Sequence, residues 1–478
     1  DFSEAADQQL QVRRFLNSLA VPQGNFCEEV LSSIQQKQEE PENVISLIQG
    51  KRSKQRRFAW AAIGLASAAL IAVSVLLTAT LKPASAPKVR VIAAEGIGTL
   101  NSEALENGKS IRLRRGILEL ELNGESRVVI EAPARFKVVT PRLLRLNSGR
   151  CFAEMEKGKS GLRIETPKGE VLDLGTRFAV DVSSPDEMKV HVFDGEVEVS
   201  DGATKRRLKE GEGVRVAESG VADESADSSL FVPRVPKAVM EETPFIHWSF
   251  DEGQGAEFNA MGRDLQPELG AGVIVQQEQP TQSKWTTGII QSALDLKRNG
   301  WATTQHPGIS GNQDRTVACW IRLPAEHQSL EVAPLVTWGL QKQKPRGKAW
   351  MFSVARFHEK SPETYGVLRL NVGGQTTFGS TNLRDGRWRH VAAVAMEGEH
   401  GASILLYVDG QLEDIRRDRV KSLDTLTDHK SSEPVQFGRH LFLQDELLRG
   451  SIDEVYIFEA ALSGDEIRQL MHSPKSEF

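Results

Sequence analysis

MKVHVFDGEVEVSD, residues 188–201, carries the clearest structural signal in the chain. Apolar and polar residues alternate on both sides of Asp194 and Gly195, which is the pattern of half-buried β-strands. The Asp-Gly pair favours a two-residue turn, because glycine accepts the positive φ that such a turn requires. We therefore predict two β-strands joined as a hairpin at Asp194 and Gly195.

Similar segments fill the rest of residues 88–216. They are short, rich in β-branched residues and separated by Gly, Pro, Asn and Asp, and no long helical period interrupts them. The clearest are RVVIEA, FKVV, LLRL, LRIET, RFAVDV and GVRVAE. This pattern predicts an all-β domain over residues 88–216.

Three stretches of this domain resemble the FecR family. They read ETPKGEVLDLGTRFAVDV, VHVFDGEVEVS and LKEGEGVRV, in the order of the family's motifs, with matches at Gly175, Thr176, Phe178, Gly195, Val197, Val199, Gly211 and Gly213. The resemblance implies a single-pass inner-membrane regulator. Its short cytoplasmic segment would control an extracytoplasmic-function sigma factor, and its periplasmic domain would receive a signal.

Residues 58–81 contain no Asp, Glu, Lys, Arg or His. A helix over this run would be about 36 Å long at about 1.5 Å per residue, enough to cross a hydrocarbon core of roughly 30 Å. A buried soluble helix and a signal peptide are the alternatives. Because Lys and Arg are denser before the run than after it, we predict a transmembrane helix with residues 1–57 in the cytoplasm. Residues 82–478 would then lie outside the inner membrane of a bacterium.

The first fifty residues are acidic, with eight Asp and Glu against three Lys and Arg. Apolar residues recur at helical spacing, for example Phe15 and Leu19, which predicts short amphipathic helices in a cytoplasmic segment over residues 1–57. Such helices leave apolar faces for a partner, and a sigma factor is the partner that the resemblance implies. A passive cytoplasmic tail is the alternative. The segment has no His and only Cys27, so sigma-factor binding would not use zinc. The chain starts at Asp1, and we expect further residues before it.

Residues 217–243 are acidic and rich in Ser, and we interpret them as an extended linker. Strand patterns return over residues 244–478, with a second Asp-Gly turn at Asp409 and Gly410. More than two hundred residues of short strands predict a two-sheet sandwich.

Five stretches of this second domain resemble the LamG-like jelly roll of the concanavalin A-like lectin and glucanase superfamily. They are HWSFDEGQG, TVACWIR, GRWRHVAAV, LLYVDGQL and GSIDEVYIFEAALSGDEI. The resemblance implies binding of carbohydrate or protein, with calcium in some members. Asp251 and Asp453 lie where the family's calcium-binding acids occur; turn acids are the alternative.

The tryptophans of the second domain divide into two groups by their neighbours. Trp248, Trp320, Trp338 and Trp388 stand in alternating strands, which favours core packing over sugar binding. Polar or loop-like residues flank Trp285, Trp301 and Trp350, which makes these three the candidate ligand-binding residues.

The sequence offers no catalytic motif. The paired carboxylates of a glycosidase, a nucleophile elbow, a phosphate loop and a His/Cys metal cluster are all missing, and His390 fits a packed strand. We expect no enzymatic activity. The net charge is −6 with mixed signs, which excludes a nucleic-acid footprint. Cys151 and Cys319 stand in separate strand-like segments, so we predict buried free thiols.

The predicted fold class is mostly β. It comprises a short helical cytoplasmic segment, one transmembrane helix, a FecR-like all-β domain and a LamG-like jelly-roll β-sandwich. The predicted function is a sensor of a periplasmic ligand, chiefly a glycan, that controls an extracytoplasmic-function sigma factor. A carbohydrate- or protein-binding envelope protein without signalling is the alternative.

Overall fold

The computed structural model describes residues 89–472. Residues 98–99, 101–104, 106–107, 277–283, 297–299, 326–328, 330, 341–347, 399–400, 418–419, 421 and 444 are excepted. Residues 84–478 form one compact unit. Its described residues make a first β domain (residues 89–226), a segment that we call the strap (residues 227–243), and a second β domain (residues 244–472).

The predicted fold class is wrong in its transmembrane part. The helices among the described residues are all too short or too polar to cross a membrane. The predicted transmembrane helix at residues 58–81 and the predicted helical segment at residues 1–57 lie outside the described residues. That prediction rested on the length and apolarity of one run and on the Lys and Arg that precede it. The fold of the described residues is mostly β, with a single α-helix of more than one turn, α5 (Gly464–His472).

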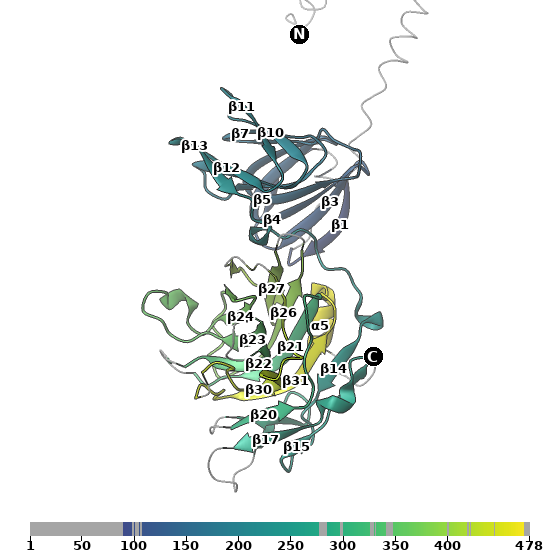
Figure 1. Cartoon of the computed structure of the whole chain (residues 1–478), viewed down its shortest axis with the longest axis vertical. Coiled ribbons are helices and arrows are strands. Elements are labelled where there is room, and N and C mark those ends of the chain that lie inside the picture. Colours follow the sequence, from purple (N-terminus) through teal and green to yellow (C-terminus); the bar gives the residue numbers. More distant parts are fainter. Residues whose placement is uncertain are drawn as a thin grey trace, which may run out of the picture. The chain divides into compact units, whose positions relative to one another are not determined.

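Within the described residues, the strands of the first domain form one thirteen-stranded sheet, whose curvature Figure 1 shows. The strands are β1 (Val89–Glu95), β2 (Ile111–Leu113), β3 (Ile117–Leu122), β4 (Ser126–Thr140), β5 (Leu143–Met155), β6 (Arg163–Thr166), β7 (Gly169–Asp173), β8 (Arg177–Val182), β9 (Glu187–Asp194), β10 (Glu196–Ser200), β11 (Lys205–Lys209), β12 (Glu212–Ala217) and β13 (Gly220–Ser225).

The long strand β5 organises this sheet. It pairs antiparallel with β4 and β8 and parallel with β6, so the order β11-β10-β7-β6-β5-β8-β9-β12-β13 branches at β5 toward β4, β3 and β1. Inward side chains of these strands, such as Phe136, Leu144 and Phe178, are buried in one apolar core. The predicted all-β character is therefore observed, because alternating residues of each strand reach that core.

The predicted hairpin at Asp194 and Gly195 is wrong. β9 pairs with β8 and β12, whereas β10 pairs with β7 and β11, so the two strands are not ladder partners. Gly195 has φ 78° and forms a corner between two parts of the sheet. A Cβ at this position would lie 2.7 Å from the carbonyl oxygen of Gly175. The glycine is thus required by a close backbone approach rather than by a two-residue turn.

The described residues of the second domain form two nine-stranded sheets that pack face to face (Figure 1). Sheet B contains β14 (Phe245–Trp248), β16 (Met261–Arg263), β18 (Trp285–Thr287), β19 (Ser292–Asp295), β21 (Arg315–Arg322), β26 (Trp388–Met396), β27 (Ser403–Val408), β28 (Gln411–Leu412) and β31 (Ser451–Phe458). Sheet C contains β15 (Glu257–Phe258), β17 (Gly272–Gln276), β20 (Gly300–Thr304), β22 (Ala333–Leu340), β23 (Ala349–Val354), β24 (Leu368–Val372), β25 (Gln375–Phe378), β29 (Arg416–Arg417) and β30 (Ser432–Phe437). Short 3₁₀ turns are η1 (Ser228–Leu230), η2 (Met240–Glu242), η3 (Pro267–Gly270) and η4 (Pro362–Thr364).

The space between the two sheets is the main apolar core. It buries aliphatic residues from both sheets together with Trp248, Trp338, Trp350 and Phe437. This is the predicted sandwich. The predicted hairpin at Asp409 and Gly410 is also confirmed, since Val408 pairs with Gln411.

The cysteines of the described residues are buried free thiols, as predicted. Burial raises the pKa of Cys151 to about 12, which makes this thiol unreactive. His390 is a packed strand residue, also as predicted, and its ring meets Trp320 edge-on.

Residues 217–243 differ from the expected extended linker. β13 occupies residues 220–225, and in the strap Phe231, Val232, Val235 and Met240 are buried. These side chains belong to an apolar cluster that also contains Phe193 of the first domain and Tyr407 of the second. The two β domains therefore share a continuous core through the strap.

Candidate functional site

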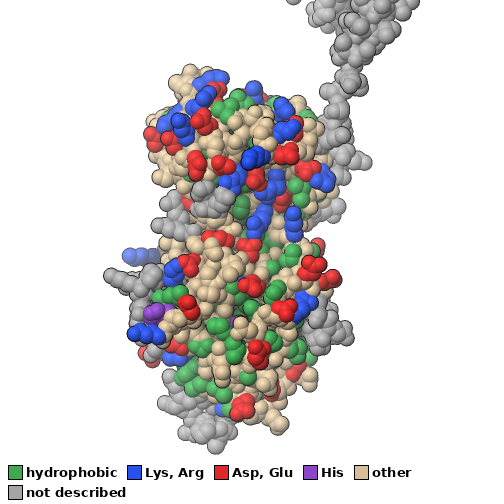
Figure 2. Space-filling model, turned by 45° about the vertical axis from the view of Figure 1, so that its right-hand side comes forward, with side chains coloured by type: hydrophobic (Ala, Val, Ile, Leu, Met, Phe, Trp, Pro, Cys, Tyr) green, Lys and Arg blue, Asp and Glu red, His purple; other side chains and the backbone are tan. Residues whose placement is uncertain are grey.

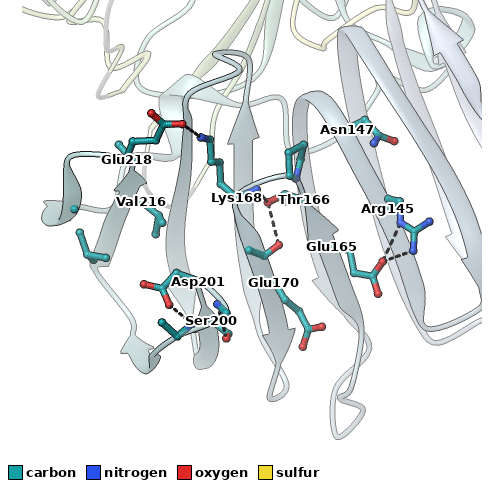
Figure 3. A pocket seen from close by; sticks show the side chains of 17 residues that line it. Arg145, Asn147, Glu165, Thr166, Lys168, Glu170, Ser200, Asp201, Val216 and Glu218 are labelled. Atoms are coloured by element: carbon teal, nitrogen blue, oxygen red, sulfur yellow. Dashed lines mark hydrogen bonds and ion pairs between the residues drawn. The ribbon is translucent and has the colours of Figure 1, made fainter.

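A cavity of about 840 Å³ opens on the first domain (Figure 3). Its walls are the turn at residues 166–169 between β6 and β7, the turn at residues 200–203 after β10, and the turn at residues 217–220 between β12 and β13. Arg145 and Asn147 of β5 complete it. The sheet order makes β10, β7, β6 and β5 neighbours, whereas the turn between β12 and β13 comes from beyond β8 and β9 in the same sheet.

Two ion pairs lie within the lining of this cavity, which also contains the carboxylates of Glu170 and Asp201. Arg145 Nη2 lies 2.6 Å from Glu165 Oε2, and Lys168 Nζ lies 3.0 Å from Glu218 Oε1, as Figure 3 shows. Asp201 accepts hydrogen bonds from the backbone N–H groups of its turn, which lower the pKa of its carboxyl below the usual range. The cavity can bind polar groups. No His or Cys is present among its described lining residues.

Asp251 and Asp453, the predicted calcium ligands, both hold the turn between β18 and β19. Asp251 accepts hydrogen bonds from Ser292 N at 3.3 Å and from Gln291 Nε2 at 3.1 Å. Asp453 Oδ2 accepts a hydrogen bond from Ile289 N at 2.7 Å, and its Oδ1 accepts one from Glu454 N at 3.0 Å. The structure thus places both acids at one turn, in the role of turn acids.

Calcium does not fit this pair of acids well. Asp453 is fully buried, and burial raises the pKa of its carboxyl to about 8. The negatively charged carboxylate, which is the form that would bind a cation, is therefore disfavoured. Over the described part of the chain, no group of three or more His, Cys, Asp or Glu could hold a metal ion. Calcium binding by Asp251 and Asp453 stays a prediction from sequence.

The sequence did not predict a buried pair of polar side chains beside Asp453. His247 Nε2 lies 2.8 Å from Glu454 Oε2, and the imidazole stacks on Tyr456 with ring centroids 3.8 Å apart. Burial raises the pKa of Glu454 to about 8 and lowers the pKa of His247 to about 3. The contact is therefore a neutral hydrogen bond at pH 7 rather than an ion pair. No local spacing signals it, because β14 and β31 lie at opposite ends of the domain's sequence.

Two of the three candidate ligand-binding tryptophans have no open ring face. Trp350 is fully buried and stacks on Trp338 with centroids 5.1 Å apart. Trp285 is 8% exposed and donates a hydrogen bond to the carbonyl of Gly255. Trp301 on β20 is half-buried, and the guanidinium of Arg439 lies 4.7 Å from its ring centroid. Trp301 thus remains the one candidate of the three with accessible surface.

The four tryptophans assigned to core packing also differ in how deeply they are buried. Trp248 and Trp338 are fully buried, as expected. Trp320 and Trp388 are half-buried on β21 and β26, and the guanidinium of Arg322 lies 4.9 Å from the Trp388 ring. Strand alternation alone did not reveal this, because the residues of a strand point to both faces of a sheet.

Carboxylates from both domains hold the strap. Glu131 Oε1 accepts a hydrogen bond from Val232 N at 2.7 Å, and Glu119 Oε2 accepts one from Val235 N at 2.8 Å. Glu466 of α5 accepts hydrogen bonds from the backbone of Val239 at 2.6 Å and of Met240 at 2.5 Å. These contacts satisfy strap N–H groups that burial would otherwise leave without partners.

Two family models match the chain. Residues 109–198 match the FecR protein family, and residues 296–468 match the concanavalin A-like lectin/glucanases superfamily. Both resemblances inferred from the motifs are therefore confirmed: the chain contains a FecR domain and a concanavalin A-like domain. No curated protein matches the chain.

Several solved structures are similar to parts of the chain. A protein classed as an anti-sigma factor, from Parabacteroides distasonis, is 22% identical with a TM-score of 0.24, and the match covers 25% of this chain. The chain spans only 61% of that protein's length. Domain 4 of the Geobacillus stearothermophilus arabinanase AbnA, in complex with arabinotriose, is 19% identical over 48% of this chain and 100% of its own, with a TM-score of 0.34.

A third similar structure is the CBM40 domain of a Ruminococcus gnavus sialidase bound to sialyllactose. It is 13% identical over 34% of this chain and 83% of its own, with a TM-score of 0.25. Since the TM-scores of these three structures do not exceed 0.34, they carry no argument about the ligand or partner of this chain.

Proposed function

We propose that the chain is a regulator in which the two β domains bind an extracellular glycan and residues 1–57 control an extracytoplasmic-function sigma factor. The observation that carries the proposal is the FecR domain at residues 109–198, joined to a concanavalin A-like domain. The placement of both domains outside the cytoplasm stays a prediction.

The regulatory half of the proposal is supported by charge. The FecR resemblance implies a short N-terminal segment that contacts a sigma factor, and the first fifty residues carry an excess of acids that suits a basic partner. Lys and Arg alternate with Asp and Glu over the face of the β domains in Figure 2. That mixed surface favours the N-terminal segment over the β domains as the site for a basic protein.

The sensing half is supported by the second domain. The resemblance to concanavalin A-like domains implies binding of carbohydrate or protein. Trp301 is half-buried on sheet C beside Arg439 and offers an aromatic surface with a planar cation next to it. A glycan is therefore the ligand class that we propose.

The experiment that tests the regulatory half is affinity capture from the native host. The full chain with a C-terminal tag is crosslinked in cells, and captured proteins are identified by mass spectrometry. We expect a sigma factor. The control is the double variant Glu28→Lys and Glu29→Lys, which reverses two adjacent charges of the acidic segment and is expected to reduce its capture about tenfold.

An empty capture from a stably expressed full chain would overturn the regulatory half. The chain would then be better described as a carbohydrate- or protein-binding envelope protein without signalling. The concanavalin A-like match, which is the longer of the two, favours this second candidate.

A further inference from the structure

A second cavity, of about 580 Å³, lies where the first domain, the strap and the second domain meet. The first domain contributes Phe152 and Phe193, the strap contributes Ser228 and Pro233, and the second domain contributes Asn312, Glu397, Gly398 and Gly401. Its volume is within the range of about 300–1,000 Å³ that is typical of small-molecule sites. We call it the junction cavity.

The charges around the junction cavity are compensated. Three arginines line it, and each has a carboxylate partner: Arg127 pairs with Glu154 and Glu119, Arg177 with Asp194, and Arg234 with Asp314. Glu397 adds a further carboxylate to the lining. An anion would find no uncompensated cation, and a cation would compete with the arginines. The balance therefore favours an uncharged ligand.

The polar groups of the cavity are nevertheless numerous and of both kinds. Guanidinium and amide N–H groups donate hydrogen bonds, and carboxylate oxygens accept them. The buried hydroxyl of Ser228 has no hydrogen-bond partner among the described residues. The rings of Phe152 and Phe193, which also line the cavity, stack with centroids 5.6 Å apart. Dense donors and acceptors beside an aromatic wall suit a neutral molecule with many hydroxyl groups.

We propose that the junction cavity binds a short neutral oligosaccharide. The proposal rests on the proposed glycan-sensing function and assigns that function a site distinct from the sheet face that carries Trp301. A ligand here contacts both domains and the strap at once, so its binding energy depends on how these three parts are arranged.

A line of contacts connects the cavity to both domains. Arg127 Nη1 of β4 donates a hydrogen bond to the carbonyl of Pro233 at 2.9 Å, and the adjacent Arg234 pairs with Asp314 of the second domain. Asp314 Oδ1 in turn accepts a hydrogen bond from Glu397 N at 2.8 Å. An occupied cavity would stabilise this line, and with it the junction, by preferring one arrangement of the domains.

The test titrates the full chain with arabinotriose, maltotriose, cellotriose and chitotriose by isothermal calorimetry. Asn312→Trp fills the mouth of the junction cavity, and Asn312→Ala removes the amide without adding bulk. Asn312 is exposed, so both variants should fold. The matched control is Asn147→Trp, which adds the same ring at the exposed Asn147 of the other cavity. Trp301→Ala removes the aromatic surface of sheet C.

We expect at least one trisaccharide to bind, with an affinity at least tenfold weaker in Asn312→Trp and unchanged in Asn147→Trp. Hydrogen exchange at the N–H groups of Val232 and Val235 should slow with the sugar bound, since these amides hold the strap. Binding that survives in Asn312→Trp but is lost in Trp301→Ala would overturn the junction site and leave glycan sensing intact. If none of the four sugars binds, the proposed ligand class is overturned. Capture of a sigma factor tests the regulatory half of the proposed function and does not depend on this result.

Discussion

Asp173 holds the turn between β7 and β8 by accepting four hydrogen bonds. Its Oδ1 accepts from Gly175 N at 3.0 Å, from Thr176 N at 2.8 Å and from the Thr176 hydroxyl, and its Oδ2 accepts from Gly161 N at 3.1 Å. Asp173→Ala leaves the buried N–H and hydroxyl of Thr176 without their acceptor. We expect a loss of about 2–4 kcal/mol in the free energy of unfolding, measured with urea at pH 7.

The control for this prediction is Asp201→Ala. Asp201 accepts similar backbone hydrogen bonds from Ala203 and Thr204, but its turn is exposed and water can replace the carboxylate. We expect a loss below about 1 kcal/mol. Equal losses in the two variants would show that the burial of Thr176 does not add to the cost of removing the Asp173 carboxylate.

Glu454 makes stability depend on pH. Burial raises the pKa of its carboxyl from 4.5 to about 8. Between these pH values the folded protein keeps a proton that the unfolded chain releases, so the contribution of Glu454 to stability is fully present below pH 4.5 and is lost as the pH rises through 8. Glu454→Gln cannot release a proton and should lose about 3–4 kcal/mol less stability than the unmodified chain between pH 5 and pH 8. Asp453 shifts in the same direction, so some slope remains. Parallel urea-unfolding curves for the two proteins would contradict the assignment.

At the scale of elements, two Asp-Gly pairs show what local sequence can predict. Asp409 and Gly410 join β27 to β28 as a hairpin, whereas Asp194 and Gly195 turn a corner between strands that do not pair. The dipeptide specifies positive φ in both places. Whether the flanking strands then pair is set by partners far along the chain, and the sequence around the turn does not contain them.

The two glycines of these pairs differ in what surrounds them. A Cβ on Gly195 would collide with the backbone carbonyl oxygen of Gly175, in the turn between β7 and β8, whereas a Cβ on Gly410 would meet the flexible side chain of Arg468. Both positions strain an L-residue by about 1–2 kcal/mol. We expect Gly410→Ala to cost about that amount and Gly195→Ala to cost about 2 kcal/mol more, by urea unfolding. A smaller loss in Gly195→Ala would mean that the corner relaxes freely.

The start of helix α5 carries a sequence signal, a capping box, that was not among the predictions above. Ser463 and Glu466 form a capping box, in which Glu466 N donates to Ser463 Oγ at 3.4 Å and Ser463 N donates to Glu466 Oε2 at 2.7 Å. The spacing Ser-x-x-Glu marks this helix start. Glu95 of β1 also accepts a hydrogen bond from Gly464 N at 2.8 Å, a contact between residues too far apart in sequence to predict.

At the scale of the whole molecule, the strap shows why amino-acid composition alone wrongly predicted an extended linker. Its acidic, Ser-rich neighbourhood is typical of a flexible linker. The groups that order it, Glu119, Glu131 and Glu466, come from three other elements, and its own Phe231 enters a core shared by both domains. The family motifs located both domains in the sequence, but they contain no information about the contacts between them.

A shared core predicts that the strap resists proteolysis. Trypsin cleaves after an exposed Arg or Lys only where several residues unfold into its active site, and cleavage after Arg234 requires the buried Val232 and Val235 to leave their places. We expect little cleavage between the two domains of the native full chain. Phe231→Ala removes a fully buried ring, at a cost of about 3–5 kcal/mol. Cleavage after Arg234 should then accelerate at least tenfold, as followed by gel electrophoresis and mass spectrometry.

The control is Val221→Ala, in the exposed strand β13 a few residues before the strap, which should leave the cleavage rate unchanged. Rapid cleavage after Arg234 in the unmodified chain would show that the strap opens without unfolding either domain. The line from Arg127 through Pro233 and Arg234 to Asp314 would then break in the resting protein, and a ligand in the junction cavity could not act on both domains. Slow cleavage that accelerates only in Phe231→Ala is the behaviour expected of a packed junction, because local opening must first disrupt the core that Phe231 shares with both domains.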